Sequence, residues 1–206
     1  MSAPRPSPWQ RRWQERYEET TGLFGTEPNE WLRSNAWRLS PGMRALCPGE
    51  GEGRNALFLA GLGLAVTAVD FAPAALARAE ASAARQGLRI ETVTADLCTW
   101  AWPEAAFDLV ALVFLQLSPD ERAVVHRAAA RALAPGGWLV LEAFAKGERL
   151  GCGPRTEESR YDAPMLRDDF AGLRLHALTV GTVLLAEGEG HRGEATVVRL
   201  LARRLG

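Results

Sequence analysis

Short apolar runs alternate with alanine-rich helical runs through the middle of the chain, and this alternation constrains the fold more than any other feature. The expected strands cover 43–47, 64–69, 89–94, 107–113 and 138–144, and the expected helices between them cover 53–61, 73–86 and 119–133. Strands that alternate with helices are typical of βαβ units. The sequence therefore predicts an α/β fold around a largely parallel sheet, with helices on both faces.

The two flanks of this region have different patterns. Residues 9–20 and 27–38 are expected to be helical, because aromatic side chains recur there at helical spacing. Near the other end, 173–186 and 195–203 are long strand-like runs separated by the turn-rich segment 187–190. This arrangement predicts an antiparallel hairpin that closes the sheet.

Two connections stand out. Ala134–Gly137 is expected to be a turn, since proline ends a helix and glycine adopts the positive φ that a tight entry into a strand requires. The segment 146–163 is polar and contains glycines. It is either a mobile loop over a site or an ordinary surface connection.

Composition excludes several classes of protein. With 206 residues, a net charge of −1 and a pI near 6.3, the chain has the size of one domain and no basic excess for binding nucleic acid. Three cysteines at unrelated spacings and three scattered histidines predict neither a disulfide framework nor a metal site. Without an apolar signal segment or membrane-length run, we expect a cytoplasmic protein with no membrane partner.

The glycine-rich segment between the first expected strand and helix carries the clearest chemical signal. It consists of Gly49, Glu50, Gly51, Glu52, Gly53, Arg54 and Asn55. Glycines there let the backbone approach a ligand, and amides at a helix N-terminus favour a carboxylate or a phosphate. The alternative is a tight turn that packs the helix on the strand, which also requires glycine.

Residues that could contact a ligand stand at the ends of three other expected strands. They are Asp70 and Phe71 after the second strand, Ala95, Asp96 and Leu97 after the third, and Val113 and Phe114 at the end of the fourth. A carboxylate at such a strand end can accept both hydroxyls of a ribose, and Asp96 can accept from an adenine amine. The alternatives are a helix cap for Asp70, a turn for Asp96 and plain core for Phe114.

The segments "GEGEGRNALFLA", "VTAVD" and "RYEETTGLFGTEPNEWL" resemble class I S-adenosylmethionine-dependent methyltransferases, in particular the small bacterial tellurite-resistance and thiopurine methyltransferase-like group. The resemblance covers roughly residues 13–145. It implies a Rossmann-like seven-stranded sheet of order 3-2-1-4-5-7-6 with the last strand antiparallel. It also implies one domain, 1–206, in which residues 1–40 form a helical lid over a core of 41–206.

The resemblance further implies roles for individual residues. Gly49, Gly51 and Gly53 would pass the methionine moiety, Asp70 would hold the ribose, Asp96 and Leu97 the adenine, and Val113 and Phe114 would line the cofactor. Tyr17, Phe24 and Trp31 would belong to the lid, or else simply pack the N-terminal helices on the core. Tyr17, Trp31, Gln116 and His191 are the candidates for contact with the acceptor.

Two positions depart from the family pattern. Cys47 stands where the family commonly has an acidic residue at the end of the first strand, and Glu50 is the candidate substitute. Gln116 stands where related enzymes often carry a histidine, and an amide cannot act as a general base. Of the histidines, His126 is expected at the surface, and His191 either reaches an acceptor pocket or is merely solvated in the hairpin turn.

The sequence thus predicts a methyltransferase that uses S-adenosylmethionine, as a monomer or homodimer, on a small acceptor such as a thiol or chalcogen compound. An activated sulfonium methyl needs mainly alignment and exclusion of water, so no catalytic residue is assigned. One alternative is a module that binds the cofactor without catalysis. The other is a dinucleotide-dependent oxidoreductase, although its GxGxxG fingerprint would place glycine where Arg54 stands.

Overall fold

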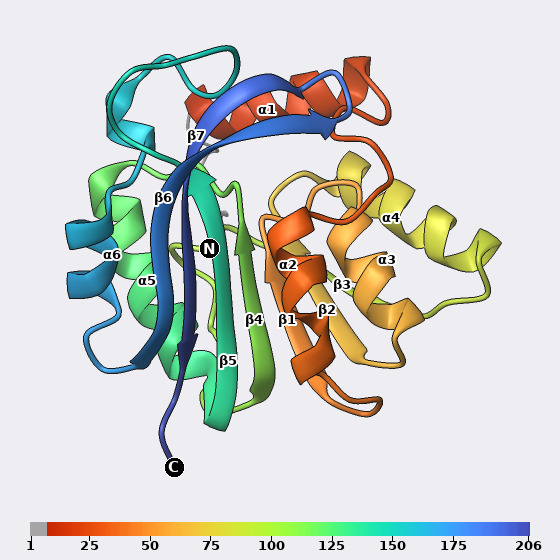
Figure 1. Cartoon of the computed structure of the whole chain (residues 1–206). Coiled ribbons are helices and arrows are strands. Elements are labelled where there is room, and N and C mark those ends of the chain that lie inside the picture. The colour runs from red at the N-terminus through yellow and green to blue at the C-terminus, as the bar shows by residue number, and fades with distance from the viewer. Residues whose placement is uncertain (1–7) are drawn as a thin grey trace.

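The computed structural model describes residues 8–206, so the first seven residues of the predicted lid lie outside the described part. Seven strands form one sheet in the order β3-β2-β1-β4-β5-β7-β6 (Figure 1). The strands are β1 (Arg44–Pro48), β2 (Ala65–Asp70), β3 (Glu91–Thr94), β4 (Phe107–Val113), β5 (Leu133–Phe144), β6 (Arg174–Glu187) and β7 (His191–Arg203). Among these strands, β7 alone runs in the opposite direction, so it pairs antiparallel with both β5 and β6. The predicted fold class and strand order are confirmed.

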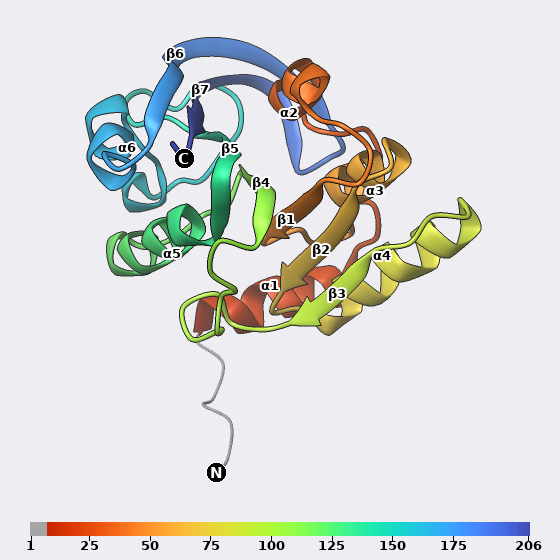
Figure 2. The same ribbon diagram turned by 90° about the horizontal axis from the view of Figure 1, so that it is seen from below.

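Six α-helices accompany the sheet in the described part of the chain: α1 (Pro8–Glu19), α2 (Glu30–Asn35), α3 (Arg54–Gly61), α4 (Pro73–Arg85), α5 (Pro119–Ala132) and α6 (Ala163–Asp169). Helices α3 and α4 cover one face of the sheet, and α5 and α6 cover the other (Figure 2). Helix α1 instead lies across the ends of the strands, at the top of Figure 1. It therefore covers the edge of the sheet at which β1, β2 and β4 end.

The central strands are buried on both faces, which explains their near-continuous apolar sequences. Successive side chains of a strand point to opposite faces. In β4, Val110 packs in one core cluster with Leu46 and Leu141, whereas Leu109 packs in the other with Ala45 and Val140. Each face of the sheet thus has its own apolar core.

The structure differs from the sequence-based expectation at four places. Helix α6 was not predicted, and its N-cap Asp162 accepts a hydrogen bond from the amide of Met165. The expected helix 27–38 is reduced to α2 and a 3-10 turn, Ala36–Arg38. Strand β5 already begins at Leu133, although Gly136 has the expected positive φ of +80°. Strand β7 begins at His191 rather than 195, because pairing with β6 continues to Glu187. Residues 191–194 have no apolar pattern, so the local sequence does not mark the start of this strand.

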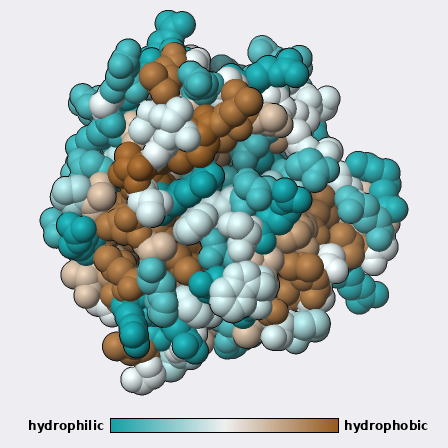
Figure 3. Space-filling model, in the orientation of Figure 1, coloured by the Kyte–Doolittle hydropathy of each residue, from teal (hydrophilic) through white to brown (hydrophobic). Residues whose placement is uncertain are grey.

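The outer edge of the sheet carries exposed apolar side chains. Strand β6 is the last strand in the sheet order, and on this face brown side chains gather over the β6–β7 hairpin (Figure 3). Val180 and Leu184 of β6 are among the exposed large apolar residues. Within residues 8–206, no helix is both long and apolar enough to cross a membrane.

Candidate functional site

A cavity lies beneath α1 where β1, β2 and β4 end, and we call it the central cavity. Four parts of the chain supply most of its walls: Trp13, Tyr17 and Phe24 of the N-terminal region; Gly49, Glu50, Arg54 and Asn55 of the glycine-rich segment 49–55, which we call the glycine loop; Asp70 and Phe71 at the end of β2; and Val113 to Gln116 at the end of β4. His191 of β7 completes the walls. In an open α/β sheet, ligands bind outside the carboxyl ends of the strands where the strand order reverses. The central cavity occupies that position between β1 and β4.

The glycines of this loop are required by two different kinds of close contact. A Cβ atom built on Gly49 would lie 2.5 Å from Cδ1 of Leu115, and one built on Gly51 would lie 2.5 Å from the hydroxyl of Tyr17. Both neighbours are walls of the central cavity. The same atom on Gly53 would lie 2.6 Å from Cβ of Ala79 in α4, so this glycine lets α3 approach α4. Gly49 and Gly51 thus stand where space at the cavity is tight, and Gly53 stands between two helices rather than between a helix and a strand.

Asp70 braces the glycine loop and borders the cavity. Its Oδ2 accepts a hydrogen bond from the amide of Gly51 at 2.8 Å, and its Oδ1 accepts from the amide of Ala72 at 2.9 Å. The N-cap of α4 is Ala72, which makes no side-chain cap bond, so Asp70 does not cap this helix. Burial raises the pKa of the carboxyl, although these amide donors oppose the rise. Carboxylate oxygens at this point can accept further hydrogen bonds from a ligand in the cavity.

Glu50 brings a second carboxyl to the cavity. Its Oε1 accepts hydrogen bonds from the amides of Asn55 and Ala56 at the start of α3, each at 2.8 Å. Burial raises the pKa of this carboxyl to about 7, against the effect of those amides and of Arg54. Cys47 lies fully buried in the apolar core, where burial raises the pKa of its thiol. The acidic group at this end of the site is therefore that of Glu50.

Helix α1 and the segment after it are held down on the glycine loop. Glu52 accepts hydrogen bonds from the amides of Gly22 and Leu23, each at 3.0 Å, and forms an ion pair with Arg78 of α4 at 3.2 Å. The phenol of Tyr17 is 6% exposed, and its pKa is raised by burial and by the nearby carboxylates. Glu52 therefore acts as a clamp between the N-terminal region and the loop.

The end of β4 forms the opposite wall. Phe114 has a positive φ of +49°, which is unusual for a residue other than glycine and is often found at functional sites. Its ring contacts Phe144 and His191, with centroids 4.7 Å and 4.5 Å away. Gln116 follows two residues later and also lines the cavity. Phe114 is thus both part of a buried aromatic cluster and a cavity wall.

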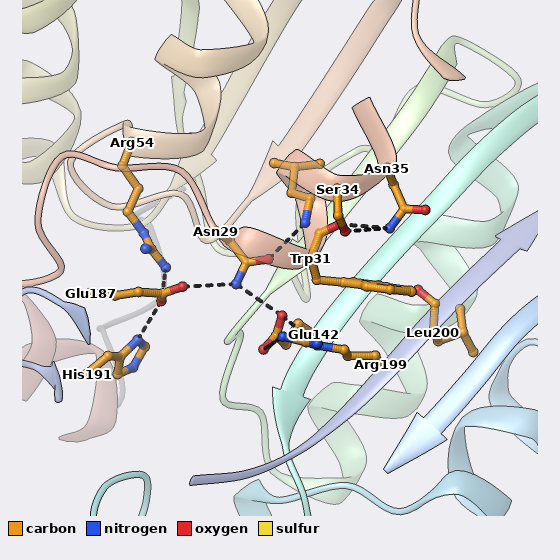
Figure 4. A network of polar contacts seen from close by, with 11 residues as sticks. Asn29, Trp31, Ser34, Asn35, Arg54, Glu142, Glu187, His191, Arg199 and Leu200 are labelled. Atoms are coloured by element: carbon orange, nitrogen blue, oxygen red, sulfur yellow. Dashed lines mark hydrogen bonds and ion pairs between the residues drawn. The ribbon is translucent and has the colours of Figure 1, made fainter. Parts of the chain in front are cut away.

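A buried polar network lies under the cavity and links four distant segments (Figure 4). The guanidinium of Arg54 forms an ion pair with Glu187 at 2.7 Å, and Nδ1 of His191 lies 3.4 Å from the same carboxylate. The side-chain amide of Asn29 donates to both Glu187 and Glu142 at 3.2 Å. This network joins the glycine loop to the β6–β7 hairpin.

The structure contradicts the expectation for His126 and excludes one of the two alternatives stated for His191. The prediction that His126 lies at the surface is wrong: it is 2% exposed, and its Nδ1 lies 2.8 Å from Asp169 of α6. His191 is 4% exposed and is not a solvated turn residue. Burial lowers its pKa, although Glu187 opposes the decrease. Its imidazole is therefore predominantly neutral near pH 7.

A second, wider cavity opens beside the first, and we call it the outer cleft. The two share the side chains of Trp13, Phe24, Gln116 and His191 as walls. The rest of the outer cleft is formed mainly by residues 149–156 and 189–192. The segment after β5 was expected to be either a loop over a site or a surface connection. In the structure it borders a cavity that shares four wall residues with the central one.

Some of the predicted site residues lie away from the central cavity. Oδ1 of Asp96 accepts a hydrogen bond from the amide of Cys98 at 2.9 Å, as a turn residue does. Leu97 is 8% exposed and packs with the core, and Ala95 packs against the same cluster. Trp31 donates from its indole nitrogen to the carbonyl of Leu200 at 3.2 Å, so it packs on β7.

The sequence did not single out Glu187, Asn29 or Leu115 as site residues. Glu187 was counted as part of a turn, whereas it is the last residue of β6. Asn29 has a local signal as the N-cap of α2, since its Oδ1 accepts from the amide of Leu32. Its contacts with Glu142 and Glu187 span more than 100 residues of sequence and leave no local pattern.

Comparison with known proteins agrees with this geometry. A family model described as a methyltransferase domain matches residues 45–137, which include β1 to β4 and the glycine loop. This part of the chain is similar to methyltransferase domains. Its strand order is the one expected from the resemblance to class I S-adenosylmethionine-dependent methyltransferases, and the match agrees with the predicted enzyme class. No curated protein sequence matches the chain.

Solved structures share the fold of this matched segment together with that of its flanks. One comes from a study titled "Conversion of a Disulfide Bond into a Thioacetal Group during Echinomycin Biosynthesis", with 22% identity, coverage of 96% of this chain and 92% of that chain, and a TM-score of 0.76. TehB from Haemophilus influenzae has 19% identity, with coverage of 95% and 67% and a TM-score of 0.74. The 1,6-didemethyltoxoflavin-N1-methyltransferase of Burkholderia thailandensis has 17% identity, with coverage of 100% and 94% and a TM-score of 0.69.

Proposed function

We propose that the chain binds S-adenosylmethionine in the central cavity and transfers its methyl group to a small molecule in the outer cleft. The observation that carries this proposal is the convergence of the glycine loop, Asp70 and Glu50 on one cavity that shares a wall with a second one. The likeness to a toxoflavin-precursor N-methyltransferase supports a small acceptor. A thiol or chalcogen compound is our preferred acceptor class, because a soft nucleophile needs little help beyond alignment.

The residues around the central cavity suit an adenosyl ligand. Gly49 and Gly51 leave room where any Cβ atom would collide with a wall, so backbone can lie against the ligand. We assign the ribose hydroxyls to Asp70 and the methionine ammonium to Glu50. The adenine would extend past β2 towards Ala95, Asp96 and Leu97, which follow the neighbouring strand β3.

When bound, the cofactor supplies an activated methyl group on a sulfonium. The chain's own contribution is alignment, which can supply on the order of 7–11 kcal/mol. His191 lies at the junction of the two cavities with its Nδ1 directed at Glu187, so Nε2 is the nitrogen that can accept a proton from an acceptor. We propose this role for His191, since Gln116 has no basic atom.

We also propose that residues 1–40 act as a lid on a single domain of residues 1–206. The described part of this lid places Tyr17 and Phe24 on the central cavity, and Glu52 holds the chain at Gly22 and Leu23. Water excluded by these side chains cannot compete with the acceptor. Trp31 belongs to the part of the lid that packs on β7.

Calorimetry with S-adenosylhomocysteine, with NADH as the comparison, tests the proposed function directly. We expect S-adenosylhomocysteine to bind and to stabilise the protein by about 2.7 kcal/mol at a hundredfold its Kd, whereas NADH does not. Turnover is then measured with thiols, selenite, tellurite and small amines. Tight cofactor binding without turnover of any acceptor would favour the non-catalytic module, and binding of NADH alone would contradict the proposal.

The affinity for S-adenosylhomocysteine is expected to rise with pH. The Glu50 carboxyl has a raised pKa of about 7 through burial, and only its charged form attracts an ammonium. Binding therefore releases a proton, and the affinity should be about tenfold higher at pH 8 than at pH 6. For the same reason this carboxyl lowers the free energy of unfolding of the ligand-free protein as pH rises from its ordinary pKa to about 7.

Calorimetry across this pH range checks the expectation, with Glu50→Gln as the matched variant. The glutamine variant should bind more weakly at pH 8 and lose most of the pH dependence between 6 and 8. An unchanged slope in that variant would remove Glu50 from the ammonium site and leave the rest of the cavity assignment in place.

A further inference from the structure

The outer cleft is strongly basic although the chain as a whole is nearly neutral. Four arginines line it: Arg16 from α1, Arg149 and Arg155 from the segment after β5, and Arg192 from β7. Glu189 is the one acidic residue among its walls. In Figure 1, α1, the teal segment and the tip of the blue hairpin meet at the top of the molecule. Three separate parts of the chain thus bring positive charge to one concave surface.

These arginines have no carboxylate partner in the described part of the chain. Within residues 8–206, Arg155 and Arg192 have no side-chain hydrogen bond or ion pair, and Arg16 only lies over the ring of Trp13 at 5.1 Å. Arg149 donates one hydrogen bond, from Nε to the carbonyl of Gly153. Other arginines of the chain, such as Arg54 and Arg78, have carboxylate partners. Guanidinium groups without a carboxylate partner around a concave surface attract anions.

The arginines of the outer cleft also lie where a bound acceptor would reach the wall shared with the central cavity. Trp13, Phe24, Gln116 and His191 separate the cleft from the central cavity and belong to both. A molecule whose charged end contacts the arginines therefore has its other end at the wall that faces the cofactor. A small ligand with one anionic end and one nucleophilic end fits this division.

We propose that the methyl acceptor is a small organic anion, whose acidic group binds the arginines of the outer cleft while its nucleophile faces His191 and the central cavity. This inference rests on the proposed methyl transfer. For a thiol acceptor, the sulfur forms a bond to the methyl carbon, and the bond from that carbon to the sulfonium sulfur breaks with its electron pair left on the cofactor. The thiol proton passes to His191 and then to solvent. A carboxylate, a phosphate and a sulfonate share the chemistry that these guanidinium groups recognise.

Three thiols that differ in charge test the inference: 3-mercaptopropionate, 2-mercaptoethanol and cysteamine. Formation of S-adenosylhomocysteine gives kcat/KM for each, in the wild-type chain and in the double variant Arg155→Glu, Arg192→Glu. For each thiol we compare kcat/KM in the variant with kcat/KM in the wild type, because the intrinsic reactivity of the thiol cancels in this ratio. We expect this ratio to fall at least about tenfold further for 3-mercaptopropionate than for 2-mercaptoethanol, and to be highest for cysteamine.

Binding to the complex with S-adenosylhomocysteine is the second readout, because it needs no turnover. Calorimetry should show that 3-mercaptopropionate binds more tightly than 2-mercaptoethanol, with a difference that shrinks at high salt. The double variant Arg127→Glu, Arg167→Glu, at exposed positions of α5 and α6, changes the net charge equally and serves as the control, with no expected effect on the preference. Failure of S-adenosylhomocysteine to bind would contradict the proposed function. Binding of this ligand without any charge preference among the thiols, in either readout, would overturn the anionic acceptor alone.

Discussion

Asp70→Asn is expected to weaken the binding of S-adenosylhomocysteine by about 10- to 150-fold, the largest effect of a single isosteric change at this site. The carboxylate borders the central cavity, and the amides of Gly51 and Ala72 already hold it in place. Asparagine keeps the shape but removes the charge that strengthens hydrogen bonds from ribose hydroxyls. The side-chain NH2 group of asparagine would also face one of those two backbone amides, so two hydrogen-bond donors would meet. Calorimetric titration of both proteins measures the loss.

The matched control for this change is Asp108→Asn. Asp108 lies in β4 at the opposite end of the sheet, where its carboxylate binds the guanidinium and the amide of Arg44. The control removes the same charge but leaves the central cavity intact, so the Kd for S-adenosylhomocysteine should be unchanged. If Asp70→Asn bound the ligand as the wild type does while remaining folded, the ribose assignment would be incorrect.

Gly53→Ala is expected to lower the free energy of unfolding by about 2–4 kcal/mol, which combines the cost of a left-handed φ with that of overpacking. Gly53 has a φ of +91°, and an added Cβ would lie 2.6 Å from Cβ of Ala79 and 3.1 Å from its Cα. Neither contact is with the flexible end of a side chain. Because α3 and α4 would have to separate, we also expect weaker cofactor binding. Denaturant unfolding monitored by circular dichroism measures the change.

Gly61→Ala in the same helix is the control. Gly61 lies at the end of α3 without a positive φ, and nothing lies within 4 Å of an added Cβ. Alanine there should be neutral or stabilise the protein by about 0.4–1 kcal/mol. Equal losses in both variants would mean that glycine in α3 matters for reasons other than the contact with Ala79.

The fold was largely predictable because its information is local. Apolar residues run without interruption through 109–113 of β4 and 138–141 of β5, as burial on both faces requires, and alanine-rich helices lie between the strands. Helix α6 escaped prediction since its seven residues are too few to establish a periodicity. The start of β7 was placed four residues late, because His191 and Arg192 pair with β6 across a turn that has no apolar pattern.

The site was predictable only in part, for the same physical reason. Asp70, Glu50 and Phe114 stand directly after strands that end at one edge of the sheet, so their positions follow from the strand pattern. The environment of His191 does not follow from its neighbours in sequence. Its ring lies 4.4 Å from that of Phe24 and 4.5 Å from that of Phe114, both far away along the chain.

The sequence by itself predicted most strands and helices of the sheet and the place of the glycine loop, because these features are carried by adjacent residues. The strand order and the expected cofactor came from the resemblance to class I methyltransferases. Only the tertiary structure decided which side chains surround the acceptor. It buried His191 on Glu187, moved Trp31 onto β7, and gathered four arginines from three segments at one cleft. Charge and burial at such a place are sums over residues that are distant in sequence, and they exist only once the chain has folded.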